Sequence, residues 1–387
     1  MNIKSLYYIT HKDNLPSILE RGIFSYDRVE GEGLCPISIA NGNTIEKRNY
    51  KTTDEKKLWD YANLYFQPRN ALMYRSLHQH HLKDLAVIDI DQKVLDEQDV
   101  IITDGDAGNE ITRFYNLSEG MKILKKQWSI IENDWWNNSD GSKRRMMAEC
   151  LIPNYVKSAY IRSVYVADDT IRNDLQKIVG NSKIQVDSEP DMFFQPKCRI
   201  PIGENISLID GGDIFFSELQ TLTVTVNLQG VMGKGLALRA REQFPDVYVA
   251  YEKACRSKKI TSARPYIYKR EVSVIDELMD LKPRNMNIEN PMKWFLLFAT
   301  KRHWRANSRI EDIEDGLKWL EKNSNKEGIQ SLAMSALGCA LGKLHWADVA
   351  PLICKHLHDI GIPVEIYLPR EYSIEPEYLT EPHLLGS

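Results

Sequence analysis

Residues 223–245, TVTVNLQGVMGKGLALRAREQFP, decide how the second half of this chain folds. An apolar run rich in β-branched residues (224–226) predicts a strand, and a helical pattern begins soon after it. Between them lie Gly230, Gly233 and Gly235. Glycine lets a ligand approach the main chain closely, and the start of a helix attracts negative charge through its N–H groups and dipole. The stretch therefore predicts a strand, a phosphate-binding turn and a helix.

The glycine spacing alone leaves an alternative open. It does not match G-x-x-x-x-G-K-[ST], the loop of nucleotide-hydrolysing proteins, because Lys234 precedes the last glycine and Leu236 stands where a hydroxyl residue is needed. It does not match G-x-G-x-x-G either. An ordinary tight turn between a strand and a helix would use the same glycines.

The complete segment from Asn227 to Ala237, NLQGVMGKGLA, resembles the ADP-ribose-binding loop of macrodomains, particularly those of the DarG type. The resemblance implies that Asn227 faces the distal ribose and that the glycine loop lines the diphosphate and ribose. The residues expected to bind ADP-ribose here are Asn227, Gly230, Val231, Met232, Gly233, Lys234 and Gly235.

Composition describes a soluble globular protein with at least two domains. The chain has 387 residues, 43% of them hydrophobic and 27% charged, and a net charge of −4. No apolar run approaches the length of a membrane span, and the N-terminus lacks a signal-peptide core, so we expect a cytoplasmic protein without a membrane partner. The cysteines lie far apart, and His78, His80 and His81 lack ligand partners at suitable spacing, so no metal is expected.

A binder of nucleic acid with this charge needs a local basic patch. The best candidate is residues 113–145, where Lys143, Arg144 and Arg145 follow several tryptophans, including Trp128. Cations and aromatic rings together suit a single strand, because they engage phosphates and stacked bases. The alternative is a solvated helix face with core tryptophans, which composition alone favours.

The first half alternates short strands and helices. Phe24–Lys57 is polar and reads as irregular, and Glu149 stands inside an apolar strand, which is unusual for a carboxylate outside a functional site. The predicted strands are Leu6–Ile9, Leu85–Ile90, Val100–Thr103, Met146–Pro153 and Tyr160–Val166, and the predicted helices are Leu15–Arg21, ended by Gly22, and Thr170–Val179.

Residues 1–195 resemble the DarT family of toxins, which transfer ADP-ribose from NAD to a base in single-stranded DNA. The resemblance depends on His11 and Asn14 before L-x-x-I-L-x-x-G-I, on Arg48, on F-x-P-R-N-A-x-x-Y from Phe66, and on A-E-C-L-I-P around Glu149. It implies an α+β transferase fold around a split, mixed sheet. Leu72-Met73 departs from the family, which tends to read Met-Leu.

The resemblance also assigns roles. Glu149 would stabilise the oxocarbenium-like ribose and take the proton of the attacking base nitrogen. Arg48, on a loop closing over the cofactor, would meet the NAD phosphates or polarise the reacting groups. His11, Asn14, Phe66, Arg69 and Tyr74 are the other residues expected to bind NAD. Alternatively, His11 is a helix cap, Arg48 a surface arginine and Glu149 half of a structural ion pair.

Three prolines between Asp187 and Glu204 mark a domain boundary. We expect a transferase domain at 1–195, a macrodomain at 203–372 and a tail at 373–387, with the two domains packed together. A strand at Ile206–Ile209 precedes Asp213 and Ile214, which match the acidic turn that recognises adenine in macrodomains. A simple turn-forming aspartate is the alternative.

Residues 295–305, FLLFATKRHWR, resemble the F-P-T-K-x-H-W-R segment of DarG-like macrodomains, whose lysine removes ADP-ribose from DNA. Lys301 takes that place, while Ala299 replaces the proline. After a strand at Gln330–Ala336, a second glycine loop reads G-C-A-L-G-K-L where relatives read G-C-G-x-G-G-L, so a Cβ at position 340 would crowd the distal ribose. Its expected ADP-ribose-binding residues are Gly338, Cys339, Ala340, Leu341 and Gly342.

These resemblances imply a fusion of a DNA ADP-ribosyltransferase with a three-layer α/β/α macrodomain that binds or hydrolyses the same modification. By resemblance alone, the target is thymidine in single-stranded DNA. Two alternatives stay open: an active transferase whose macrodomain only reads or clamps the product, and a nucleotide-binding module without enzymatic activity.

Overall fold

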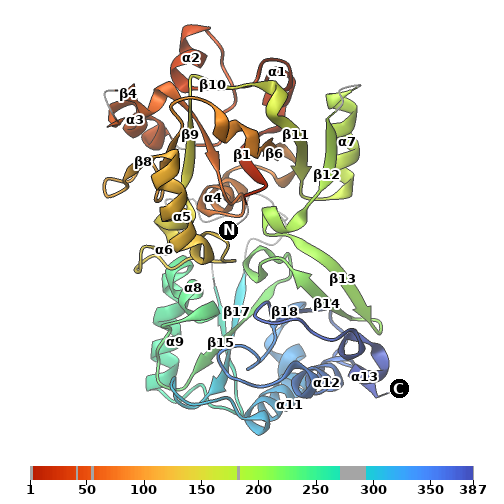
Figure 1. Ribbon diagram of the computed structural model, residues 1–387. Coiled ribbons are helices and arrows are strands. Elements are labelled where there is room, and N and C mark those ends of the chain that lie inside the picture. Colours follow the sequence, from red (N-terminus) through yellow and green to blue (C-terminus); the bar gives the residue numbers. More distant parts are fainter. Residues whose placement is uncertain (1–2, 41, 54–55, 181–183, 271–292, 387) are drawn as a thin grey trace. The chain divides into compact units, whose positions relative to one another are not determined.

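The computed structural model describes residues 3–40, 42–53, 56–180, 184–270 and 293–386 (Figure 1). They form two compact units that divide between Phe193 and Phe194, and each is an α/β structure with its own sheet. The predicted two-domain α/β fold is confirmed. No helix in the described ranges is long and apolar enough to cross a membrane.

The first unit is built on an eight-stranded sheet of order β12-β11-β6-β1-β5-β9-β7-β8. Only β11 and β12 run parallel, so the sheet is mixed, as predicted. It is split where β1 pairs with β5 through Tyr7 and Tyr65 alone, whereas β1 pairs with β6 along its whole length. Its strands are β1 (Ser5–His11), β5 (Tyr61–Tyr65), β6 (Leu85–Asp91), β7 (Ile101–Thr103), β8 (Phe114–Asn116), β9 (Glu149–Pro153), β11 (Ile161–Val166) and β12 (Gln185–Ser188).

The helices of this unit agree with the sequence where apolar periodicity is strong. Helix α1 covers Leu15–Arg21 and ends at Gly22, whose φ of 94° is left-handed, as expected for a glycine cap. The unit also contains two short strand pairs, β2 (Ile23–Phe24) with β10 (Tyr155–Val156) and β3 (Thr52–Thr53) with β4 (Lys56–Lys57). Its other helices are α2 (Tyr26–Gly31), α3 (Gly42–Tyr50), α4 (Ala71–Gln79), α5 (Leu117–Ile131), α6 (Ser142–Met146) and α7 (Asp169–Val179).

Two predictions about this half were wrong. The segment expected to be irregular contains α2, which the Ser25 hydroxyl caps, and α3, whose Ile45 carbonyl accepts a hydrogen bond from Trp59 Nε1 at 2.9 Å. Tertiary contacts of this kind stabilise helices that lack an apolar face. The strand expected from Met146 begins at Glu149, because Met146 is the last residue of α6.

The second unit has a seven-stranded sheet of order β13-β14-β19-β18-β15-β17-β16, parallel except at its two edges. Side chains alternate between two cores: Leu296 and Phe298 pack with α11 and α12, and Phe295 and Leu297 pack with α8 and α9. This alternation makes the three predicted layers (Figure 1). The strands are β13 (Pro196–Ile202), β14 (Ile206–Gly211), β15 (Thr221–Asn227), β16 (Tyr266–Lys269), β17 (Trp294–Lys301), β18 (Leu332–Ser335) and β19 (Val364–Tyr367), and the helices are α8 (Gly235–Gln243), α9 (Pro245–Arg256), α11 (Ile310–Glu327), α12 (Trp346–Leu357) and α13 (Glu381–Leu385).

Both ends of the second unit extend beyond the expected macrodomain. Residues expected in the linker form β13, an edge strand that accommodates Pro196 and Pro201 because its outer side needs no ladder hydrogen bonds. The expected tail forms α13, which buries Leu384 in the core shared with α12. Pro196 and Pro201 therefore lie in a strand, and the two units divide within the segment from Asp187 to Glu204.

Gly120→Ala will destabilise the first unit. The added Cβ on α5 would lie 2.3 Å from Ile102 Cβ on β7, and overpacking of this kind costs about 1–3 kcal/mol. Gly31→Ala is the matched control: nothing lies within 4 Å of its Cβ, and alanine favours a helix. Calorimetry of the full chain should show a lower unfolding temperature for Gly120→Ala alone; equal transitions would contradict this packing.

Candidate functional site

The carboxylate of Glu149 is the centre of the first unit's site. Glu149 is the first residue of β9 and is fully buried. Its oxygens accept hydrogen bonds from Arg48 Nη1 at 3.1 Å, from Arg48 Nη2 at 2.9 Å and from the Ala107 N–H at 2.8 Å. Burial raises the pKa of Glu149, and the Arg48 guanidinium opposes that rise. The result is a carboxylate with increased proton affinity in one fixed orientation.

Arg48 lies on α3, not on the loop that the sequence suggested, and only 7% of its surface is exposed. Burial disfavours the charged guanidinium, but the Glu149 carboxylate outweighs burial and raises the pKa of Arg48. Both donating nitrogens of the fork face one carboxylate, which is the strongest geometry for this pair. The structure thus joins two predicted catalytic residues that are 101 positions apart.

Sequence reasoning missed three neighbours of this pair. Tyr65 stands opposite Glu149 in the register of β5 and β9, and burial, together with the nearby carboxylate, raises its pKa. Ala107 donates its backbone N–H from a loop that follows β7, and Thr103 accepts the N–H of Glu149 at 2.8 Å. The Gly/Asp composition of residues 104–109 was the signal for that loop.

His11 and Asn14 organise the end of β1. The Nδ1 atom of His11 accepts the Asp13 N–H at 3.3 Å, as expected if His11 is a helix cap. A ligand would therefore contact His11 through Nε2. Asn14 exchanges two hydrogen bonds with the backbone of Ile37, at 2.8 and 2.9 Å. Asn14 therefore fastens the segment before α3 to the end of β1.

The other residues expected to bind NAD make packing contacts. Phe66 belongs to the core, Arg69 donates to the Asp191 carbonyl at 2.6 Å, and the Tyr74 ring packs edge-on against Trp135 at 4.9 Å. These contacts position α4 and the segment before it. A contact of these three side chains with NAD stays a prediction.

The expected nucleic-acid patch divides into buried and exposed members. Trp128 packs against the core and edge-on to Phe66 at 6.4 Å, and Arg144 is held by the Asp104 carboxylate at 2.6 Å. Arg145 donates to the Asp140 carbonyl at 3.0 Å, and Lys143 is exposed. Trp128 is therefore a half-buried ring that packs against the core, and Lys143 is the exposed cation of the run.

In the second unit, the first glycine loop joins β15 to α8 as predicted. The amide of Asn227 folds into the loop: Nδ2 donates to the Val231 carbonyl at 2.6 Å, and Oδ1 accepts the Gln229 N–H at 2.8 Å. Gly230 has a φ of 75°, which only glycine adopts easily. Lys234, the N-cap of α8, makes no side-chain cap hydrogen bond, so the first N–H groups of the helix are available to an anion. Met232 is buried in the core.

The second glycine loop leaves little room for side chains. A Cβ on Gly342 would lie 2.3 Å from Ser308 Oγ, and Gly338 has a φ of 75°. Lys343 has a φ of 62°, a left-handed conformation that favours glycine. Cys339 is buried, whereas Ala340 and Leu341 are exposed. A Cβ on Gly235 would lie 3.4 Å from Leu341 Cδ1, so the two glycine loops meet.

Lys301 lies where these loops converge. It is the last residue of β17 and pairs in register with Asn227 at the end of β15. Its Nζ donates a hydrogen bond to the Leu341 carbonyl of the second loop. Burial lowers the pKa of Lys301, and the neighbouring Lys343 lowers it further. The lysine is therefore poised to lose its proton more easily than an ordinary lysine.

Asp213 and Ile214 lie at the end of β14, as expected, and both are buried. The Asp213 carboxylate accepts the Phe215 N–H at 3.1 Å and pairs with the Arg239 guanidinium of α8. These contacts are the ones expected if Asp213 is a turn-forming aspartate. Recognition of adenine by Asp213 stays a prediction.

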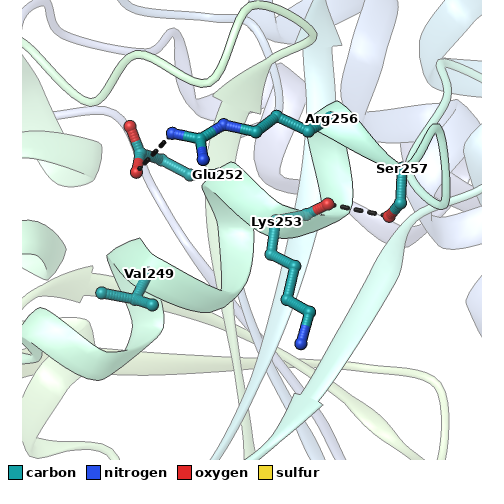
Figure 2. Close-up of a pocket in the computed structure, with 5 residues that line it drawn as sticks. All are labelled: Val249, Glu252, Lys253, Arg256 and Ser257. Atoms are coloured by element: carbon teal, nitrogen blue, oxygen red, sulfur yellow. Dashed lines mark hydrogen bonds and ion pairs between the residues drawn. The ribbon is translucent and has the colours of Figure 1, made fainter.

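Another hollow, of about 540 Å³, lies on the outer face of α9 (Figure 2). Figure 2 shows that its lining residues follow one another along this helix, where Glu252 pairs with Arg256 and the Ser257 hydroxyl donates to the Lys253 carbonyl. None of the predicted site residues lines it. Its surface lacks the converging loops found at Lys301, so it is not the candidate site.

Comparisons with known proteins find relatives of both units. Residues 7–194 match the family model described as "ssDNA thymidine ADP-ribosyltransferase, DarT". The chain is 45% identical over 386 residues to a DNA ADP-ribosyl transferase–DNA ADP-ribosyl glycohydrolase fusion protein of Thermosipho africanus, covering 99% of each chain. A solved structure, Thermosipho africanus DarTG in complex with ADP-ribose, is 44% identical with a TM-score of 0.76, covering 99% of this chain and 100% of that one. A DNA ADP-ribosyl glycohydrolase of Thermus aquaticus is 35% identical over 178 residues, 45% of each chain.

Glu149→Ala will destabilise the first unit by about 3–5 kcal/mol, because it leaves the buried Arg48 guanidinium without its partner. Glu149→Gln is the matched control, since its amide oxygen still accepts from Arg48 or Ala107. Denaturant unfolding of the full chain measures the difference. Equal loss of stability in the two variants would contradict the assignment of the cost to an unpaired Arg48.

Proposed function

Because this chain belongs to the family of DNA ADP-ribosyl transferase–DNA ADP-ribosyl glycohydrolase fusion proteins, we propose that it attaches ADP-ribose to DNA with its first unit and removes it with its second. The target is thymidine in single-stranded DNA, NAD is the donor, and no metal takes part. The observation that carries this proposal is the pair of built sites, Arg48–Glu149 and Lys301 between two glycine loops.

In the transferase reaction, the bond between nicotinamide and the ribose carbon breaks, and nicotinamide leaves with the bonding electron pair. A ring nitrogen of the thymine then bonds to that carbon and loses its proton. Glu149 is the base that accepts this proton, and its negative charge stabilises the oxocarbenium-like ribose. The raised pKa of Glu149 supports this role, because a stronger base accepts the proton more readily.

Arg48 positions that carboxylate. Its bidentate contact fixes the plane of the Glu149 side chain, and its positive charge opposes the rise in the pKa of Glu149 that burial causes. Arg48 and Lys51 bring positive charge to the same carboxylate and to Asp106, which suits a site for a diphosphate donor. His11 and Asn14 contribute to the donor site from the end of β1.

In the hydrolase reaction, the neutral amine of Lys301 attacks the ribose carbon that carries the thymine. The bond from that carbon to the base nitrogen breaks, and the nitrogen keeps the electron pair and takes up a proton. Water then displaces the lysine and releases free ADP-ribose. The two glycine loops hold the diphosphate and distal ribose, and the lowered pKa of Lys301 supports a neutral nucleophile.

A second candidate is a macrodomain that binds the modification without removing it. The observation in its favour is the hydrogen bond of Lys301 Nζ to the Leu341 carbonyl, which engages the amine within the protein. Ala340 and Lys343, which replace glycines of relatives, alter the same loop. Incubation of modified oligonucleotide with the chain in the absence of NAD decides: release of free ADP-ribose excludes a pure reader.

Glu149→Gln will strongly slow the labelling of DNA. The amide keeps the shape of the side chain but cannot accept the proton or supply charge, so we expect the labelling rate to fall by about 100-fold or more. Mass spectrometry of oligonucleotides that contain a single thymidine, incubated with NAD, provides the measurement. An oligonucleotide without thymidine is the control for the base, and wild-type rates in Glu149→Gln would rule out this assignment.

Removal of ADP-ribose will depend on pH through Lys301. Activity requires the neutral amine, so it should rise as the pH rises through the lowered pKa of Lys301. Lys343→Gln removes the neighbouring positive charge that lowers the pKa of Lys301. The rising limb of the pH–rate profile should therefore move to higher pH. The rate of release from modified oligonucleotide, measured between pH 6 and 10 at about equal ionic strength, tests the shift. A limb that stays in place, or moves to lower pH, would show that Lys343 does not act on Lys301.

A further inference from the structure

The loop that follows Lys301 exposes a large aromatic side chain. Trp304 is 47% exposed, its ring stacks on His303 with centroids 5.7 Å apart, and the Arg305 guanidinium lies 4.4 Å from its centroid. A tryptophan exposed to this degree offers a large, rigid apolar face to a partner. Trp304 belongs to the same sequence motif as Lys301, and the proposed hydrolysis uses only Lys301 of that motif.

This loop is held at both of its ends. Arg302 forms a bidentate ion pair with the buried Asp312 of α11, at 2.9 and 2.8 Å. Ser308 is buried, and its N–H donates to the Gly342 carbonyl of the second glycine loop at 2.9 Å. Within the loop, the Ala306 N–H donates to the His303 carbonyl at 3.0 Å. The exposed residues 303–305 are therefore presented on a fastened turn.

Exposed apolar side chains gather around the same place. In the described part of the second unit, Trp304, Val231 and Leu341 are three of the five large apolar residues that are exposed, the others being Val249 and Tyr372. Val231 lies on the first glycine loop, and Leu341 lies on the second. Trp304 follows Lys301 by three positions, which limits the distance between their Cα atoms to about 10 Å.

We propose that Trp304, supported by His303 and Arg305, is a stacking platform for the nucleotide next to the modified thymidine when the second unit holds ADP-ribosylated single-stranded DNA. This inference rests on the proposed function of that unit. Base stacking on an exposed ring does not depend on the base, and Arg305 adds positive charge for the adjoining phosphate. No acidic side chain pairs with Arg305 within the described ranges of the chain.

Trp304→Ala should lower kcat/KM for release of ADP-ribose from a modified oligonucleotide by about ten-fold, mainly through KM. It should leave release from the modified mononucleoside unchanged, since that substrate has no neighbouring base. Trp304→Phe should keep most of the activity, and Val249→Ala, at another exposed apolar position, should have no effect. The modified substrates are made with NAD and the full chain carrying Lys301→Ala. An equal loss on both substrates, or no loss on the oligonucleotide, would overturn the platform.

Photo-crosslinking separates this inference from the proposed hydrolysis. A modified oligonucleotide with 5-bromodeoxyuridine beside the modified thymidine is irradiated with the Lys301→Ala chain, and crosslinked peptides are identified by mass spectrometry. A crosslink at Trp304 supports the platform even if the wild-type chain releases no ADP-ribose from either substrate. Crosslinks confined to other peptides would refute the platform, whatever the rate of hydrolysis.

Discussion

The bidentate ion pair between Arg48 and Glu149 is the interaction on which the first half of the molecule depends. It joins α3, a helix without an apolar face, to the first residue of a central strand. Burying both charges is unfavourable unless each is fully paired, and the Ala107 N–H completes the set of donors around the carboxylate. The same contacts that make burial tolerable also fix the proposed proton acceptor in place, so the stability of the fold and the proposed chemistry depend on the same atoms.

In the second half, parallel strands bring the residues of the candidate site together. Since β15, β17 and β18 run in one direction, the segments that follow them emerge at one edge of the sheet. Asn227, Lys301 and the second glycine loop meet there, although they are far apart in sequence. Tyr251 buttresses the arrangement from α9, because its hydroxyl donates to the Asn227 carbonyl at 2.6 Å. The proposed site for a diphosphate sugar thus combines backbone N–H groups with the amine of Lys301, which lies near that of Lys343.

The sequence predicted most where local chemistry decides structure. The strand, glycine turn and helix from residue 221 to 243 follow from an apolar run, glycines and a helical pattern that are adjacent in sequence, and Gly22 ends α1 because its backbone is left-handed. Prediction failed where tertiary contacts decide. Residues 42–50 read as irregular because the stabilising partners of α3, Glu149 and Trp59, are distant. Binding of nucleic acid by Trp128 stays a prediction, since its ring packs edge-on against Phe66 of the core and is half-buried.

The central claim is that one chain attaches a group with one unit and removes the same group with the other. Its most direct test follows the mass of a single-thymidine oligonucleotide over time, with limiting NAD and either the wild-type chain or Lys301→Ala. With the wild type, the mass should rise by one ADP-ribose and then return to its starting value as free ADP-ribose appears. With Lys301→Ala, it should rise and stay. Equal, lasting modification by both chains, or none by either, would contradict the claim.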